Sequence, residues 1–410
     1  MNVTAHRSLL SYLWLVLLII LVSIVAGAAS ALFLTLLDVA IAIHHQYTSL
    51  LFLLPVAGVV LVWCYQKWGK NAGQGNHLLL DEVHELQGKV PLRMAPLVLF
   101  GTLITHLFGG SAGREGTAVQ MAGSLAAWIS RHFHVPKNFH RILLLSGIAA
   151  GFASVFGTPW AAAIFAIEIP VRGSWQWRYV LATLLAAMVG HVTCLAWGID
   201  HTNYRYSGLS FDGFHQWSGW EICCVIIAGI ACGLVSRFFV WMAHASQHLF
   251  EKITRFPLLR PFIGGVCIIL LTWAIGSRDY LSLGVISTDG GVSILSSFSQ
   301  GGATQWSWFW KIIFTVVTLG CGFKGGEVTP LFFIGAALGN LLGVSLDQSV
   351  ALFAGIGMIA VFAGAANAPL ACAILGIELF GPHFVAAFAL ACLCSFFVSG
   401  KASIYKTQKL

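Results

Sequence analysis

The stretch 109–123 reads GGSAGREGTAVQMAG, and it decides how the rest of the sequence is interpreted. It places Arg114 and Glu115 side by side in a chain of which only 9% is charged. Glycines surround this pair, and the mostly apolar residues that follow predict a helix. Free N–H groups at a helix start attract an anion, and glycine lets the backbone approach it closely. We therefore expect Glu115 and an anion to compete for one site.

Composition predicts a polytopic helical membrane protein. The 410 residues are 58% hydrophobic with a mean hydropathy of +0.84, whereas about a quarter of the residues in soluble domains are charged. Apolar runs long enough to cross a bilayer recur along the chain, beginning with Leu9–Leu37. That run is too long for the apolar part of a cleaved signal peptide, so we expect it to be retained. We expect no attached soluble regulatory domain.

Basic residues predict the orientation. Most can be placed on one side, which by the positive-inside rule is cytoplasmic and carries both termini. Only Arg205 and Arg278 fall clearly in loops on the other side. The net charge of +7 therefore reflects topology and gives no indication of nucleic-acid binding. We expect a multi-pass protein of the cytoplasmic (inner) membrane of a microbe. The residues placed on the cytoplasmic side are Arg7, Lys67, Lys70, Arg131, Lys137, Arg141, Arg172, Arg178, Lys252, Arg255, Arg260, Lys401, Lys406 and Lys409.

The sequence predicts no metal site, cofactor or enzyme. Its ten cysteines are scattered through apolar segments without metal-ligand spacing, and we interpret them as packing residues. The histidines form no HExxH motif. His244 and His248 lie four positions apart, but the preferred interpretation is a helix end near the membrane surface. No nucleophile and base can be paired.

An internal repeat is the strongest organisational signal. GREGTAVQMAGSLA from position 113 aligns with GGEVTPLFFIGAAL from position 325, which pairs Glu115 with Glu327. FGTPWAAAIFAIEI from position 156 aligns with GAANAPLACAILGIEL, which pairs Glu168 with Glu378. Both offsets are close to half of the chain. We expect two homologous halves, about 9–198 and 218–400, with broken helices around a midplane site. We interpret Glu168 and Glu378 as capping or interface residues.

Glu115 is the first candidate for function. An ionised carboxylate at membrane depth is costly, so a functional role is the default interpretation. When protonated, it can leave the positive end of the helix, and an anion can take its place. One group would then carry the proton and block the anion path, which is the minimum for proton–anion exchange. The alternative is a structural ion pair between Glu115 and Arg114.

Two further segments supply candidate polar groups. In GGEVTP, Glu327 can carry a proton and Thr329 can donate to an anion; the alternatives are that Glu327 caps its own helix and that Thr329 bonds back within it. In GQGNH, the amide of Asn76 can donate to an anion without adding charge. His77 can bind a proton or an anion, or be hydrogen-bonded at a helix end.

At these residues the chain resembles the CLC family of anion transporters. GREG at 113–116, FGTPWAAAIFAIE ending at Glu168 and GGEVTP at 325–330 follow one another at the spacing of that fold. The resemblance covers nearly the whole chain. It implies a homodimer whose subunits each have a pore, and an all-helical fold with an inverted repeat of tilted, partly broken helices.

Departures from the usual CLC pattern resemble the branch of fluoride/proton antiporters. The usual Gly-Ser-Gly-x-Pro and Gly-x-Phe-x-Pro motifs are replaced by GQGNH at 73–77 and GEVTP at 326–330. Ile169 stands where many chloride/proton exchangers have a second glutamate. The serine position holds methionine or asparagine in the fluoride branch, and Asn76 fits the latter. The positions of pore aromatics in some members hold His77 and Leu80. Tyr405 falls at the position of the pore tyrosine.

The resemblance implies an antiporter that exports cytoplasmic fluoride as protons enter. Fluoride is small and strongly hydrated, so it needs focused hydrogen-bond donors. Alternatives with the same fold are a chloride/proton exchanger, a passive anion channel, and a receptor or assembly subunit that does not transport. We expect Glu115 and Glu327 to transfer protons, and we expect the anion to contact Gly113, Arg114, Gly116, Val328, Asn76, His77, Thr329 and Tyr405.

Overall fold

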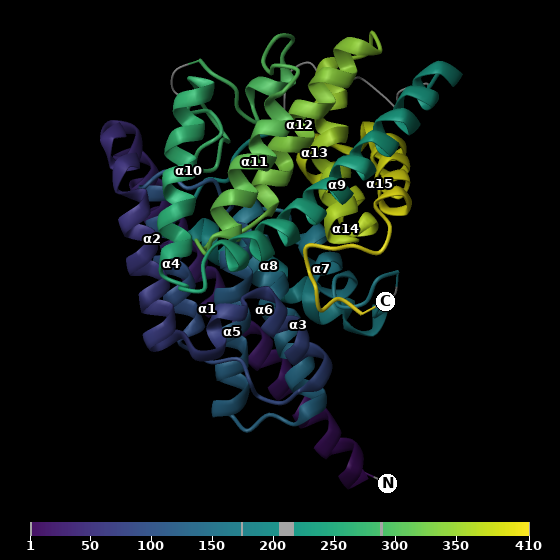
Figure 1. Ribbon diagram of the computed structural model, residues 1–410. Coiled ribbons are helices and arrows are strands. Elements are labelled where there is room, and N and C mark those ends of the chain that lie inside the picture. Colours follow the sequence, from purple (N-terminus) through teal and green to yellow (C-terminus); the bar gives the residue numbers. More distant parts are fainter. Residues whose placement is uncertain (1, 174, 205–216, 288–289, 410) are drawn as a thin grey trace.

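The computed structural model describes residues 2–173, 175–204, 217–287 and 290–409 (Figure 1). Within these ranges the chain forms fifteen α-helices and no β-strand. Seven helical segments are long and apolar enough to cross a membrane, and shorter apolar helices accompany them. The predicted class, an all-helical polytopic membrane protein, is confirmed. Arg205, which the sequence places on the side opposite most basic residues, lies outside the described residues.

The first half of the chain, purple to teal in Figure 1, contains eight α-helices. The predicted first apolar segment is confirmed, and its helix is longer than expected because helix-forming residues continue on both sides of it. The short polar piece after α2 forms only the ten-residue α3. The helices are α1 (Asn2–Gln46), α2 (Leu54–Cys64), α3 (Asn76–Glu85), α4 (Met94–Leu107), α5 (Glu115–His132), α6 (Lys137–Phe156), α7 (Pro159–Glu168) and α8 (Val180–Ala196).

The described residues of the second half, teal to yellow in Figure 1, form seven α-helices. Its interior is formed by α12 and α13, and every residue from 351 to 366 in α13 is buried. The helices are α9 (Gly219–Ile253), α10 (Leu259–Ile275), α11 (Ser307–Gly320), α12 (Val328–Ser345), α13 (Val350–Ala366), α14 (Pro369–Phe380) and α15 (Val385–Ser399).

Both halves interrupt a buried helix pair in the same way. Gly157 ends α6 in the left-handed conformation (φ 73°), and Pro159 begins α7. Asn367 ends α13 in the same conformation (φ 54°), and Pro369 begins α14. Glycine and asparagine tolerate this conformation best, and proline suits the first position of a helix. The expectation of broken helices is therefore confirmed at 157–159 and at 367–369.

The C-terminal tail returns to the interior. Figure 1 shows it passing beside α14 and ending near α7. The N–H of Ile404 donates to the carbonyl of Ala365 in α13 (2.9 Å), and the N–H of Arg172 donates to the carbonyl of Lys409 (2.8 Å). Tyr405 is buried as a result. The tail thus joins the end of α7 to the end of α13.

Candidate functional site

Two glycine loops from opposite halves pair with each other. The N–H of Gly113 donates to the carbonyl of Gly326, and the N–H of Gly326 donates to the carbonyl of Gly113, both at 2.6 Å. A Cβ on Gly326 would lie 2.8 Å from the backbone nitrogen of Gly116, so only glycine fits. This short antiparallel bridge brings the beginning of α5 against the beginning of α12. Two helix N-termini, with their free N–H groups, therefore share one small region.

The carboxylate of Glu115 lies at the N-terminus of α12. Its Oε1 accepts from the hydroxyl of Thr329 at 2.5 Å, and its Oε2 accepts from the N–H of Thr329 at 3.0 Å. The N–H of Arg114 also donates to Oε2, at 3.2 Å. The side chain is 1% exposed. A buried negative group therefore occupies donors that an anion would use at a helix start.

The neighbouring arginine contacts this carboxylate more loosely. Nε of Arg114 lies 3.7 Å from Oε1 of Glu115, which is an ion pair but too long for a hydrogen bond. The guanidinium donates through Nη2 to the hydroxyl of Thr202 at 3.3 Å. The ion pair considered from sequence is therefore present, but Thr329 makes the shorter contacts with Glu115.

The second glycine motif presents Glu327, Val328 and Thr329 at the start of α12. Glu327 is the residue that precedes the helix, and its side chain makes no capping hydrogen bond. The hydroxyl of Thr329 turns to Glu115 instead of bonding back within α12. Both structural alternatives for these residues are therefore wrong. Val328 is buried as the first residue of α12.

The GQGNH segment lies beside the beginning of α5. A Cβ on Gly116 would be 3.2 Å from Nδ2 of Asn76 and 3.1 Å from Cα of Gly326, so three loops converge here. Among the described residues, neither Oδ1 of Asn76 nor Nδ1 of His77 has a hydrogen-bond partner. The carbonyl of His77 accepts from the hydroxyl of Thr407 in the tail at 3.2 Å. Oδ1 of Asn76 thus keeps acceptor capacity, and Nδ2, the donor end of the amide, lies next to the paired glycines.

Tyr405 reaches the interior through a chain of aromatic contacts. Its ring lies edge-on to that of Phe165, 6.3 Å between centroids. Phe165 contacts Phe362 at 5.8 Å, and Phe362 contacts Phe332 at 5.7 Å. Phe332 follows Thr329 by three positions in α12, so it lies close to the same face of that helix. The tyrosine therefore packs in the layer of rings next to the start of α12.

Glu168 and Glu378 cap helices, as the sequence favours, but each caps a helix of the other half. The carboxylate of Glu168 accepts from the N–H groups of Leu370 and Ala371 at the start of α14 (3.1 and 2.7 Å). The carboxylate of Glu378 accepts from the N–H groups of Trp160 and Ala161 at the start of α7, at the same two distances. These reciprocal contacts fix α7 against α14.

Ile169 is buried and follows Glu168 without adding any group that can bind a proton. Leu80 is also buried. With His77, it is one of the two positions that the sequence resemblance associates with pore aromatics. Within the described residues, no group of three histidine, cysteine, aspartate or glutamate side chains could hold a metal ion.

Two charged groups, the buried Lys311 and the half-buried Lys324, were missed from the sequence. Lys311 is fully buried in α11, where Nζ donates to the carbonyls of Tyr280 and Ser282 (3.1 and 2.9 Å). A lysine inside an apolar helical segment was the available signal. Lys324 precedes the second glycine motif and donates to the carbonyl of Gly73 at 3.4 Å. It therefore connects the loop before α12 with the loop before α3.

Glu82 in α3 was also missed. It accepts from Nε2 of His140 (3.1 Å) and from the N–H groups of Gly88 and Lys89 (2.6 and 2.8 Å). Burial acts to raise the pKa of this carboxyl, but the hydrogen bonds outweigh it and hold the pKa below the usual 4.5. Glu82 therefore ties the end of α3 to α6.

Comparison with known proteins places this fold and site in a family. Residues 57–400 match the family described as voltage gated chloride channel. A chloride/fluoride channel protein of Pseudomonas syringae pv. tomato is 43% identical over 390 residues, covering 95% of this chain and 85% of the relative. An H(+)/Cl(−) exchange transporter of Cronobacter sakazakii is 26% identical over 346 residues, covering 80% and 70%.

A solved structure agrees with the sequence matches. The crystal structure of a CLC-type fluoride/proton antiporter has a TM-score of 0.91 and 31% identity, covering 97% of this chain and 98% of that chain. Both the sequence match and the structural match span the paired glycine loops and the capped helices described above. This chain belongs to the voltage gated chloride channel (CLC) family.

Proposed function

We propose that this protein is a fluoride/proton antiporter in which Glu115 exchanges a proton and an anion at one site. The observation that carries the proposal is the pair of hydrogen bonds from Thr329 to the buried Glu115 carboxylate. Protonation removes the charge that these donors hold, so the side chain can withdraw. The N–H and hydroxyl of Thr329 are then free for a small anion. The 31%-identical structure named a fluoride/proton antiporter supports this function.

The donor set favours fluoride over larger halides. Fluoride has a high cost of dehydration, and only close, focused donors replace its water. Thr329 supplies two such donors, and the amide of Asn76 supplies another from the adjacent loop. The N–H of Arg114 donates to the same carboxylate, and we propose that the N–H groups of Gly116 and Val328, at the two helix starts, add to these donors, whereas the N–H of Gly113 is taken by the carbonyl of Gly326. These donors are uncharged, so they do not hold the anion too tightly. The Arg114 side chain is the positive group next to them.

A second candidate is chloride/proton exchange by the same site. The Cronobacter relative carries that function in its name, and the Pseudomonas relative is named for both halides. Against it stand the missing serine in GQGNH and the hydrophobic Ile169. We therefore place chloride exchange, or passive anion conduction, second.

We propose that Glu327 carries the proton on the inner side. Ile169 cannot carry a proton. Glu327 does not cap α12 and is only partly buried, so its carboxyl remains available for proton transfer. Tyr405 lies beside this region and would donate its hydroxyl to the anion on the way out of the cytoplasm. We propose that His77 lies in the same entry path; its Nδ1 has no hydrogen-bond partner among the described residues, and its carbonyl accepts from the hydroxyl of Thr407 in the tail.

The charge pattern and the family support a proposal for the cellular arrangement. We propose a homodimer in the cytoplasmic membrane, with both termini inside the cell. We also propose that residues 9–198 and 218–400 are two inverted repeats; the reciprocal capping by Glu168 and Glu378 supports this division. Because hydrofluoric acid enters cells neutral and dissociates inside, protons that flow inward could drive the trapped anion out.

The decisive experiment is transport by the purified protein in liposomes. Fluoride efflux is followed with an ion-selective electrode, and proton uptake is followed with a pH-sensitive dye. We expect fluoride to move far faster than chloride, with proton flow in the opposite direction. Equal rates for the two halides would favour the chloride exchanger, and a reversal potential that ignores the pH gradient would favour a channel. No flux of either halide would contradict transport altogether.

A further inference from the structure

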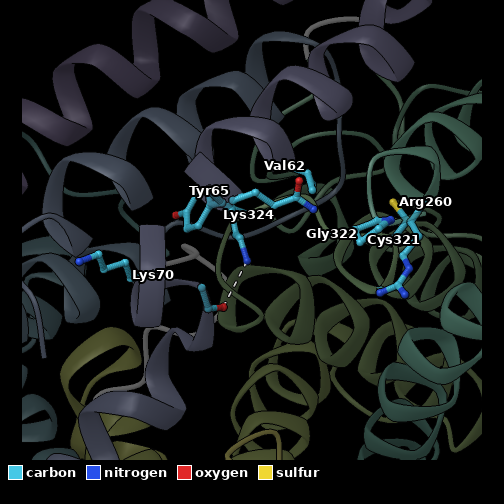
Figure 2. A pocket seen from close by; sticks show the side chains of 11 residues that line it. Val62, Tyr65, Lys70, Arg260, Cys321, Gly322 and Lys324 are labelled. Carbon is cyan, nitrogen blue, oxygen red and sulfur yellow. Dashed lines mark hydrogen bonds between the residues drawn. The ribbon is translucent and has the colours of Figure 1, made fainter. Parts of the chain in front are cut away.

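A cavity of about 350 Å³ opens where the ends of α2 and α11 meet the beginning of α10 (Figure 2). Gly73 of the GQGNH segment lines it, but Glu115, Asn76 and Thr329 do not, so the cavity is distinct from the carboxylate site. Its walls come from the segment after α2, from the residues before and in the first turn of α10, and from the loop that follows α11. The cavity therefore lies at the ends of membrane helices, where a bilayer changes from acyl chains to head groups.

The lining of this cavity is basic. Lys70, Arg260 and Lys324 contribute to it, and the lining contains no aspartate or glutamate. Figure 2 shows Lys70 and Arg260 on opposite sides of Lys324, so the three cations are spread along the cavity. Lys70 and Arg260, which the sequence places on one side of the membrane, therefore line the same cavity.

These cations are incompletely neutralised by the protein. Lys324 donates to the carbonyl of Gly73 at a long 3.4 Å and lies 4.7 Å from the centre of the Tyr65 ring. Arg260 has an ion-pair partner in Glu251 at 3.8 Å, but Glu251 is 55% exposed, so water screens the pair. Lys70 is exposed. The site therefore suits a ligand with a negative charge.

The apolar surroundings indicate what carries that charge. Tyr65, Val62 and Cys321 line the cavity beside the cations. Outside it, Trp63 and Trp68 expose 43% and 49% of their surface on the same segment. Tryptophans at this depth are typical of the interface between lipid and water. A free inorganic anion would use only the basic part, whereas a phospholipid would use both.

We propose that this cavity binds the phosphate group of an anionic phospholipid from the adjacent leaflet. Lys324 and Lys70 contact the phosphate, Arg260 contacts the rest of the head group, and the acyl chains follow the exposed apolar surfaces of α2 and α10. Basic pockets between membrane helices bind such head groups, and each basic residue contributes separately. The ligand class is therefore an anionic glycerophospholipid with at least one charged phosphate.

The test is a lipid titration of the intact purified chain in detergent. Native mass spectrometry counts the bound molecules of phosphatidylglycerol, with phosphatidylcholine as the neutral comparison. We expect the wild type to retain phosphatidylglycerol preferentially, and Lys70→Gln and Arg260→Gln each to weaken this binding about fivefold. Lys70→Gln/Lys324→Gln is expected to weaken it further, whereas Lys324→Arg is expected to retain it. Lys252→Gln removes an exposed charge outside the cavity and serves as the control.

The variants, the control and a competing anion together decide whether the cavity binds a lipid. Lys70 is exposed, so its variant is expected to fold, and size-exclusion chromatography checks this for all of them. Equal retention of phosphatidylglycerol by the wild type, the cavity variants and the control would overturn the proposal. Inorganic phosphate is added as a competitor: if it displaces the lipid completely and binds without lipid, the site is one for a free anion and the lipid assignment is wrong.

Discussion

Thr329 donates both its hydroxyl and its N–H to the carboxylate of Glu115, which lies 214 positions earlier in the sequence. The two residues belong to different halves of the chain, and each stands at a helix start. The carboxylate of Glu115 from one half therefore occupies the hydrogen-bond donors of Thr329 in the other half and closes the site. An anion gains access to these donors only when the carboxylate leaves them.

Glu115→Gln is expected to abolish proton transport. The amide has nearly the same size, and its single oxygen can still accept from one of the two Thr329 donors, but it cannot take up a proton for transfer. Proton flux in liposomes should fall to the level of protein-free vesicles. Glu85→Gln, on an exposed glutamate of α3, is the matched control and should transport protons as the wild type does. Undiminished proton flux in Glu115→Gln would reject the exchange role of this residue.

Thr329→Val is expected to weaken fluoride binding. The substitution removes the hydroxyl donor and keeps the N–H donor and the side-chain volume. A hydrogen bond to a charged group contributes about 1.5–3 kcal/mol, so the apparent affinity for fluoride should fall about tenfold to a hundredfold. Half-saturating concentrations of fluoride efflux measure this, and Thr329→Ser should restore most of the affinity. Wild-type affinity in the valine variant would place the anion elsewhere.

The helix starts and breaks could be predicted from sequence because their causes are local. Glycine, asparagine and proline act on their own backbone, so the ends of α6 and α13 follow from Gly157, Pro159, Asn367 and Pro369. Membrane helices follow from apolar runs in the same way. These signals need no knowledge of which segments pack together.

The contacts between the two halves could not be predicted. Aligning the repeats shows which residues occupy equivalent positions, but it does not show which residue each of them contacts. Thr117 aligns with Thr329, but its hydroxyl bonds to that of Thr102 at 2.6 Å, whereas Thr329 bonds to Glu115. The capping role of Glu168 was favoured, but its target in α14 depends on the packed fold. Basic residues could be assigned to one side, but nothing local predicted that Lys70 and Arg260 line one cavity.

Glu168→Gln and Glu378→Gln are each expected to lower the stability of the fold. Each change removes the negative charge that accepts two N–H groups at a helix start of the other half, at a cost of about 1–3 kcal/mol. Thermal unfolding in detergent should show a lower midpoint for both variants. Glu251→Gln, at an exposed position in α9, is the control. Shifts no larger than that of the control would mean that these contacts do not hold α7 against α14.

Glu82→Gln is expected to make stability less dependent on pH in the acid range. The pKa of Glu82 lies below 4.5 in the fold and near 4.5 in the unfolded chain. Its stabilisation is therefore complete above pH 4.5, and it is lost as the pH falls below 4.5 through the lowered folded value. The variant should be less stable than the wild type above pH 4.5, and the difference should shrink below it. Unfolding midpoints on both sides of pH 4.5 measure this; a constant difference would contradict it.

Gly326→Ala is expected to disrupt the junction between the two halves. The added Cβ would lie 2.8 Å from the backbone nitrogen of Gly116 and 3.3 Å from that of Glu115, and neither backbone can move without breaking the bridge to Gly113. Overpacking of this kind costs about 1–3 kcal/mol, and the displaced helix starts should also lose fluoride transport. Gly219→Ala, at the start of α9, is the matched control, because a Cβ there meets nothing within 4 Å. Unfolding midpoints and fluoride efflux distinguish the two variants. The control should match the wild type in both measurements. If Gly326→Ala also matches the wild type, the close approach of the two glycine loops is not required.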